Sequence, residues 1–296
     1  MNGVLVVDKP KEFTSFDVVA VIRKLSGQRK IGHTGTLDPN ATGVLPLLLG
    51  NATKAQDIVP NHDKEYIADF LLGITTDTLD IWGQVKTERK SEVCRSEIER
   101  VIKQFKGEIQ QIPPMFSAVS VGGQRLYDLA RKGVEVERKA RPVTIYELEL
   151  RSFDEKTQRG TLRVKCSKGT YIRTLIDDIG RELGTGAVMT ALRRTMACGF
   201  TLEKAYSLDE IKKLSQNGEL ENKLMSTESL FYGYPELWVT DAQATRFYNG
   251  GELDISRTKL TDKNFAEGSI FRVKGLGKFL GLGIIKDNSI KVYKHF

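Results

Sequence analysis

One stretch decides how this sequence is interpreted: Lys30-Ile31-Gly32-His33-Thr34-Gly35-Thr36-Leu37-Asp38-Pro39-Asn40-Ala41-Thr42-Gly43. Glycines and threonines surround a single carboxylate, Asp38, which stands directly before a proline. Because residues 29–43 show no sustained hydrophobic period, we predict a loop here. Long polar loops inside compact domains tend to carry chemistry, so a functional loop is favoured. Taken alone, however, an Asp-Pro pair is typical of an ordinary turn, and that simpler interpretation stays open.

The segments on either side of this loop predict a mixture of strands and helices. Apolar runs and period-two alternation predict strands at residues 3–7, 65–73, 142–150 and 160–166, the last two as antiparallel partners. Capping residues predict helices that begin near Thr14-Ser15, Ser96, Thr170 and Ser207. Short strands at 268–274, 278–286 and 289–293 predict a small β-rich domain that starts near residue 235. We therefore expect an α+β fold.

The composition is that of an ordinary folding chain with some positive charge. Its 296 residues carry a formal net charge of +7, and they are numerous enough for one large and one small domain. The longest apolar run, 44–49, is too short to span a bilayer, and the N-terminus lacks a signal-peptide pattern. Three widely spaced cysteines form no metal-binding motif with the three histidines. We expect a cytoplasmic protein with no disulfide, metal or membrane contact.

Positive charge is concentrated in two stretches. Residues 159–194 contain eight basic and three acidic side chains, and residues 124–141 contain six basic and three acidic ones. Such runs form either a solvated face or a surface that binds a polyanion. Charge alone does not separate these two interpretations.

No Walker A motif, GxSxG elbow, HExxH or strand-linked GxGxxG occurs, which removes the commonest hydrolase and nucleotide-binding interpretations. Residues 32–43, GHTGTLDPNATG, instead resemble the catalytic-loop signature of the pseudouridine synthases of the tRNA pseudouridine synthase B type. Further matches follow in family order over the first 200 residues: DKP at 8–10, KEY at 64–66, TDTLD at 76–80, PPMFSA at 113–118, KGTYIR at 168–173 and LRRT at 192–195. Chance does not explain so many matches in one order.

The resemblance implies an isomerase that converts uridine 55 in the T-loop of tRNA to pseudouridine without cofactor or metal. The uracil is cut from its ribose, turned and rejoined through carbon. By this resemblance Asp38 is the catalytic carboxylate, acting at the ribose C1′ either as a nucleophile or as a base on a glycal route. A nearby guanidinium would keep such a carboxylate ionised, and Arg173 in the matching Tyr-Ile-Arg motif is its expected partner.

Five further residues match positions around the family's pocket. Tyr66 matches a tyrosine that stacks on the target base or takes a proton from it. His33 matches a residue that fills the gap left by the extruded nucleotide. Asp80, Tyr171 and Leu192 match positions that line the pocket. Each also has a simpler explanation, because tyrosine and leucine are ordinary core residues, a loop histidine makes local hydrogen bonds, and aspartate favours turns.

The resemblance also implies surfaces that hold the RNA. Residues 113–141 resemble an inserted segment that grips the T-arm through phosphate contacts. Its basic residues Arg131, Lys132 and Arg141 are the implied substrate-binding residues of this segment, and Lys9, Arg193 and Arg194 in the matched DKP and LRRT motifs are further ones. Residues 271–283 resemble part of a PUA domain, a small β-barrel-like RNA-binding module whose glycines let backbone and RNA approach closely.

We therefore expect a pseudouridine synthase catalytic domain over residues 1–230, with a mixed, mainly antiparallel sheet, and a PUA-like domain over 235–296. The family resemblance implies a monomer that binds tRNA and needs no guide RNA. Two alternatives remain: a guide-RNA-dependent pseudouridine synthase, and a tRNA-binding folding helper without chemistry. Two residues depart from the family pattern. Glu12 replaces a glycine expected in a tight turn, and Met196 replaces an arginine expected to contact phosphate.

Overall fold

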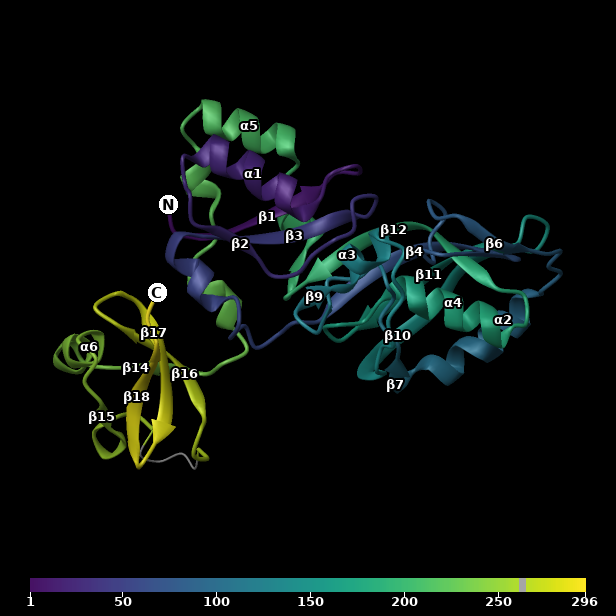
Figure 1. The fold of residues 1–296 in the computed structure, drawn as a ribbon. Coiled ribbons are helices and arrows are strands. Elements are labelled where there is room, and N and C mark those ends of the chain that lie inside the picture. Colours follow the sequence, from purple (N-terminus) through teal and green to yellow (C-terminus); the bar gives the residue numbers. More distant parts are fainter. Residues whose placement is uncertain (261–264) are drawn as a thin grey trace.

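A nine-stranded sheet forms the centre of the molecule in the computed structural model, which describes residues 1–260 and 265–296 (Figure 1). Its strands are β1 (Gly3–Lys9), β2 (Ile31–His33), β3 (Thr42–Leu49), β4 (Lys64–Leu72), β7 (Gly107–Gln111), β10 (Arg141–Asp154), β11 (Arg159–Cys166), β12 (Ala187–Ala197) and β13 (Phe200–Thr201). The main order is β1-β3-β12-β4-β11-β10-β7, with β2 beside β3 and β13 beside β12. Only the β12–β3 pair of this sheet is parallel, which confirms the expected mixed, mainly antiparallel sheet.

Helices α2 (Arg95–Val101) and α4 (Ile172–Glu182) cover one face of the sheet over β4, β10, β11 and β12. The apolar residues of α4 that recur at helical spacing pack against the alternate residues of β4 that point to the same side. Tyr66 on β4 and Leu192 on β12 belong to this apolar cluster. The candidate site therefore lies at the margin of the main core.

Helices α1 (Ser15–Ser26) and α5 (Leu208–Gln216) cover the other end of the sheet, over β1 and β3 (Figure 1). The α1 helix begins where Thr14 accepts a hydrogen bond from the Asp17 amide, and it ends at Gly27 in the left-handed conformation. These ends confirm the helix predicted from its caps. Ser207 caps α5 in the same way, with Glu210 completing the capping box.

A second sheet forms a separate lobe, drawn in yellow-green to yellow in Figure 1, in the order β14-β16-β17-β18-β15. Its strands are β14 (Glu236–Trp238), β15 (Leu253–Asp254), β16 (Ile270–Gly275), β17 (Lys278–Lys286) and β18 (Ser289–Lys294). Helix α6 (Asp241–Tyr248) packs on this sheet through Ala244 and Phe247. The lobe agrees with the predicted small C-terminal β domain of PUA type.

Smaller elements complete the fold. Two hairpins project from the main sheet, one formed by β5 (Ile74–Thr76) and β6 (Val85–Glu88), the other by β8 (Ser120–Val121) and β9 (Gln124–Arg125). The β8–β9 hairpin leads into helix α3 (Leu126–Arg131). This hairpin and α3 lie within the insertion predicted around 113–141. Short 3₁₀ helices occur at Gly50–Ala55, Ile102–Phe105, Leu202–Lys204, Leu220–Lys223, Thr227–Phe231 and Ile255–Arg257.

Several predicted boundaries need correction. The segment 29–43 is not entirely loop, because Ile31–His33 pairs with β3 as a short strand. Helix α2 is capped by Cys94, whose amide donates to Glu97 at 2.8 Å, and not by Ser96. Helix α4 begins at Ile172, after Tyr171, and not at Thr170. The turn at Glu12 forms despite the missing glycine, since Glu12 adopts a left-handed φ of 68° that strains a residue with a side chain.

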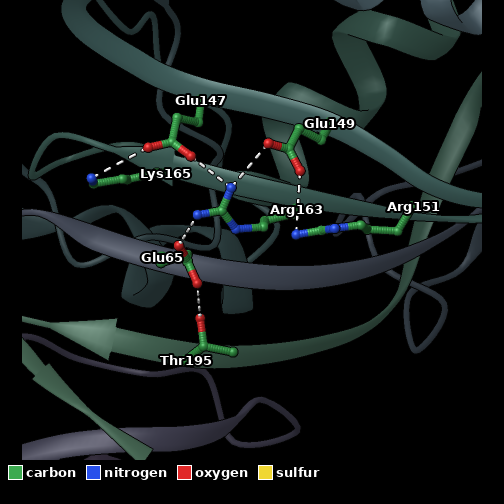
Figure 2. Close-up of polar contacts among 7 residues, drawn as sticks. All are labelled: Glu65, Glu147, Glu149, Arg151, Arg163, Lys165 and Thr195. Atoms are coloured by element: carbon green, nitrogen blue, oxygen red, sulfur yellow. Dashed lines mark hydrogen bonds and ion pairs between the residues drawn. The ribbon is translucent and has the colours of Figure 1, made fainter.

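The face of the main sheet opposite α4 carries a network of ion pairs (Figure 2). Arg163 on β11 pairs with Glu65 and Glu147, each at 2.6 Å, and with Glu149 at 3.1 Å. Thr195 on β12 donates a hydrogen bond to Glu65 at 2.8 Å. The network ties four adjacent strands together. Arg163 and Lys165 are thus ion-paired on this face. Arg173, Arg181 and Arg193 of the stretch 159–194 pair with carboxylates elsewhere, so the stretch does not form one continuous basic surface.

No helix in the described residues is both long and apolar enough to cross a membrane. Within the same residues, His, Cys, Asp and Glu side chains form no group of three or more suited to a metal ion.

Candidate active site

Asp38 stands on a loop whose two shoulders are buried in the core. Leu37 and Ala41 belong to the main apolar cluster, and the Leu37 amide donates to the Ser15 hydroxyl at 2.9 Å. The Ala41 amide donates to the Asp38 carbonyl at 3.1 Å, which closes a tight turn. The Asp38 side chain remains 42% exposed. The backbone is thus held firmly while the carboxylate faces outward, as a group that must reach a substrate requires.

Arg173, at the start of α4, supplies the charge that faces this carboxylate. Its Nε lies 3.1 Å from Asp38 Oδ2, so the predicted ion pair is present. The side chain is only 7% exposed, and its two terminal nitrogens donate to the carbonyls of Thr78 at 3.0 Å and Phe116 at 2.8 Å. A buried guanidinium with every edge occupied has one orientation. Asp38 therefore has a fixed, hydrogen-bonded cationic partner.

Asp80 forms a second carboxylate contact with the same guanidinium, at 3.6 Å. Burial raises the pKa of Asp80, while its hydrogen bond from Thr78 and the charge of Arg173 oppose that effect. Thr78 Oγ1 and the Trp82 amide both donate to Asp80 Oδ1, at 2.7 and 3.2 Å. Asp80 thus fixes the turn between β5 and β6 and links it to Arg173.

Lys9 and Arg194, both predicted to bind the substrate, are completely buried in the structure. Lys9 Nζ donates to the carbonyls of Pro10, Phe13 and Pro39, at 2.8, 2.5 and 3.0 Å. Burial lowers the pKa of Lys9 to about 8, and the nearby Asp38 charge acts against that shift. Arg194 donates to the carbonyls of Val44, Thr36 and Gly35. Both cations hold the Asp38 loop from inside the protein.

Tyr66 lies beneath this loop on β4, directly opposite Arg194 on β12. It is buried, and burial raises the pKa of its phenol to about 12, with the Arg194 charge opposing the shift. Leu192, two residues earlier on β12, is buried in the same apolar cluster. A protonated, flat phenol beside a leucine forms an apolar floor next to the charged Asp38–Arg173 pair.

His33 and Tyr171 lie at the edges of the site. His33 is half-buried at the end of β2, and its Nδ1 is buried without a hydrogen-bond partner in the described part of the chain. Burial and the neighbouring Arg194 charge lower its pKa, so the ring is neutral at pH 7. The backbone of Tyr171 is clamped by Gln111, which accepts from its amide at 2.7 Å and donates to its carbonyl at 3.0 Å.

The remaining predicted residues do not converge on Asp38. Arg193 is on the opposite face of β12 from Leu192 and Arg194, because side chains alternate along a strand. It pairs with Asp8 at 2.7 Å and donates to Thr42 Oγ1. In contrast, three basic side chains of the insertion are exposed and have no carboxylate partner within the described ranges: Arg131, Lys132 and Arg141.

Sequence reasoning missed the groups that fix Arg173 and Tyr171. The carbonyls of Thr78 and Phe116 and the amide of Gln111 all come from segments distant from α4. Backbone carbonyls leave no signal in a sequence. Phe116 did fall in a matched motif, PPMFSA, but that match carried no indication of a contact with Arg173.

Comparison with known proteins identifies the family of this chain. Residues 23–172 match the model of the TruB family pseudouridylate synthase (N terminal domain), and residues 173–231 match that of the tRNA pseudouridylate synthase B C-terminal domain. A Clostridium tetani protein named tRNA pseudouridine synthase B is 43% identical over 295 residues, covering 99% of both chains. A protein of the same name from Pseudomonas fluorescens is 41% identical over 297 residues, covering 97% of this chain and 93% of the relative.

Solved structures show the same architecture. A chain in an H/ACA RNP bound to a substrate RNA containing 2′-deoxyuridine matches with a TM-score of 0.74 at 25% identity, over 99% of this chain and 84% of its own. A Cbf5-Nop10-Gar1 complex gives 0.74 at 27% identity with the same coverage. The fold and these matches thus define a pseudouridylate synthase, an isomerase. Within that class, the chain belongs to the TruB family.

Proposed function

We propose that this protein isomerises uridine 55 in the T-loop of tRNA to pseudouridine, with Asp38 as the catalytic carboxylate. One observation carries the assignment: Asp38 is a partly exposed carboxylate on a rigid loop, 3.1 Å from a buried guanidinium that is fully hydrogen-bonded. The relatives named tRNA pseudouridine synthase B extend over the whole chain, which supports tRNA as the substrate.

The reaction breaks the bond between uracil N1 and the ribose C1′ and forms a bond between uracil C5 and the same carbon. The proton on C5 is lost after the new bond forms, and N1 gains one, so the product is an isomer of the substrate. Asp38 acts on the ribose, as a nucleophile at C1′ or as a base that leads to a glycal. Both routes begin with an ionised Asp38, and Arg173 Nε lies 3.1 Å from its Oδ2.

Tyr66 and Leu192 form the floor on which the flat uracil rests. A base in a folded T-loop must leave its stack to reach this floor, and that extrusion costs free energy. The neutral His33 ring stands at the edge of the site and is suited to stack in the vacated space. Arg131, Lys132 and Arg141 on the insertion carry the exposed positive charge that would position the RNA backbone.

We further infer a monomeric cytoplasmic enzyme that recognises the T-arm without a guide RNA. The support is the insertion at 113–141, whose Phe116 carbonyl reaches the active-site arginine at 2.8 Å. This segment therefore joins the RNA-contacting surface to the catalytic centre within one chain. The inferred localisation is supported by the relatives, which are bacterial proteins named for acting on tRNA.

The test is conversion of an unmodified tRNA transcript by purified protein, without guide RNA or added metal. We expect Asp38→Asn to reduce the rate of conversion by about 10²–10⁴-fold and to leave tRNA binding intact. The substitution removes the carboxylate but keeps the size and shape of the side chain. Asp209→Asn, at an exposed position on α5, is the matched control and should convert at the wild-type rate. Wild-type turnover by Asp38→Asn would refute the assignment of Asp38. Binding without conversion by the wild type would favour the guide-dependent enzyme or the folding helper.

A further inference from the structure

Trp82 is an exposed tryptophan attached to the catalytic centre. It keeps 45% of its surface accessible, and it belongs to none of the apolar core clusters of the described chain. Its amide donates to Asp80 Oδ1 at 3.2 Å, and Asp80 in turn contacts Arg173, the partner of Asp38. The backbone of Trp82 is thus two side chains away from the catalytic carboxylate.

The Trp82 ring reaches a second segment that flanks Asp38. Lys11 Nζ lies over the ring, 5.7 Å from its centroid. Lys11 belongs to the turn that Lys9 and Glu12 fasten to the Asp38 loop, because both Lys9 Nζ and the Glu12 amide donate to the Pro39 carbonyl. The indole therefore spans from the β5–β6 turn to the turn after β1. The first turn accepts a hydrogen bond from Arg173, and the second donates hydrogen bonds to Pro39.

The Trp82 ring is accessible at the rim of the candidate site, with the Lys11 ammonium group over it. A flat aromatic ring next to a cation is the arrangement with which proteins hold single-stranded nucleic acid, since the ring stacks on a base and the cation neutralises a phosphate.

We propose that Trp82 and Lys11 form a stacking platform for an unpaired nucleobase adjacent to the target uridine. The proposal rests on the RNA substrate of the proposed function and adds a substrate-positioning site to it. Trp82 stacks on the base, and Lys11 contacts the phosphate that follows or precedes it. Because the platform is linked to Asp38 through Asp80 and Arg173, a base held there fixes the position of the uridine ribose relative to the carboxylate.

Binding of a T-arm stem-loop RNA tests the platform, with dissociation constants measured in the inactive Asp38→Asn background and turnover in the active one. We expect Trp82→Ala to weaken binding by about 5- to 150-fold, the range for loss of one base–aromatic stack. The rate at saturating RNA should fall as well, because the uridine ribose is then no longer held in position relative to Asp38. Trp82→Phe should restore most of the affinity. Lys11→Gln should make the binding constant less dependent on salt: the slope of log K against log salt concentration should become shallower by about 1, the amount expected for one lost phosphate contact.

Val85→Ala is the matched control, since Val85 lies on the same hairpin and is 58% exposed but is not aromatic. It should bind as the wild type does. Replacing one loop nucleotide at a time by an abasic site identifies the base that stacks on Trp82. When that base is missing, the wild type and Trp82→Ala should bind the RNA with the same affinity. Unchanged binding by Trp82→Ala, in a preparation whose wild type converts the uridine, would overturn the platform. Weak binding that Trp82→Phe does not restore would also overturn it. A wild type that neither binds nor converts the RNA would instead refute the proposed function.

Discussion

Tyr66 shows how a single position is defined by its surroundings. From the sequence it was either a core tyrosine or a base-stacking residue, and the structure makes it a buried residue that also borders the site. Burial raises the pKa of its phenol to about 12. The side chain therefore stays protonated throughout the ordinary pH range, which suits stacking on uracil and not the role of an ionised base.

The raised pKa predicts a pH dependence of stability. Between about pH 10 and 12 the folded protein keeps the Tyr66 proton while the unfolded chain releases it, so folding stability falls as pH rises through this window. The loss from this residue is at most about 1.4 kcal/mol per pH unit. We expect Tyr66→Phe to lack this part of the alkaline destabilisation, as measured by urea unfolding from pH 9 to 11. If the free energy of unfolding depended on pH in the same way in both proteins, the raised pKa of Tyr66 would be contradicted.

At the scale of elements, the Asp38 loop is held by strand β12. Arg194 is fully buried, and its guanidinium donates to Val44 at 2.7 Å, Gly35 at 3.1 Å and Thr36 at 3.2 Å. Gly35 itself packs so closely that a Cβ there would lie 3.3 Å from the Lys64 side chain. The loop backbone thus packs against the side chains of Arg194 and Lys64. Its shape depends on the several hydrogen-bond donors that the Arg194 guanidinium directs at different carbonyls.

We therefore expect Arg194→Lys to destabilise the protein despite conserving charge. A lysine cannot reach three carbonyls in different directions, and each buried carbonyl left without a donor costs about 1–3 kcal/mol. The free energy of unfolding should fall by about 2–5 kcal/mol, and activity should fall with it because Asp38 loses its fixed position. Arg193→Lys is the control, since Arg193 is half-buried on the opposite face of the same strand. Equal effects of the two substitutions would argue against the anchoring role of Arg194.

At the scale of the whole molecule, the two sheets share an apolar cluster. Phe231, in the segment between them, is fully buried and contacts Phe296 with ring centroids 5.2 Å apart. The same cluster contains Val4 of the main sheet and Leu282 of the second one. Glu228 pairs with Arg272 at 2.8 Å across the same junction, and both side chains are largely buried. The second lobe is therefore packed onto the catalytic domain and not merely tethered to it.

This junction predicts that the two lobes unfold together. Phe231→Ala should lower the free energy of unfolding by about 3–5 kcal/mol, the usual cost of removing a buried aromatic ring. Calorimetry of the wild type should show one transition, and the variant should show either one transition at lower temperature or two separate ones. Tyr232→Ala is the control, because Tyr232 is next to Phe231 in the sequence but is 65% exposed. Two transitions already present in the wild type would contradict the coupling.

The sequence by itself determined the class of fold, most strands and helices, and the Asp38–Arg173 pair. Caps, strand alternation and helical spacing are local patterns, so they can be recognised without the fold, and the matched motifs named both members of the pair. Predicted helix and strand ends were wrong by one or two residues at Cys94 and Ile172, where competing caps and turns decide the boundary.

Only the tertiary structure decided which charges face the solvent. Lys9, Arg193 and Arg194 looked alike as basic residues in matched motifs, yet two of them are buried beneath the loop and the third pairs with Asp8 on the other face. In the same way, Arg163 is neutralised by three glutamates from neighbouring strands. These outcomes depend on the register of strands far apart in the sequence, including a bulge between Arg194 and Met196. A shift of one residue reverses which face a side chain occupies, and no local pattern records that shift.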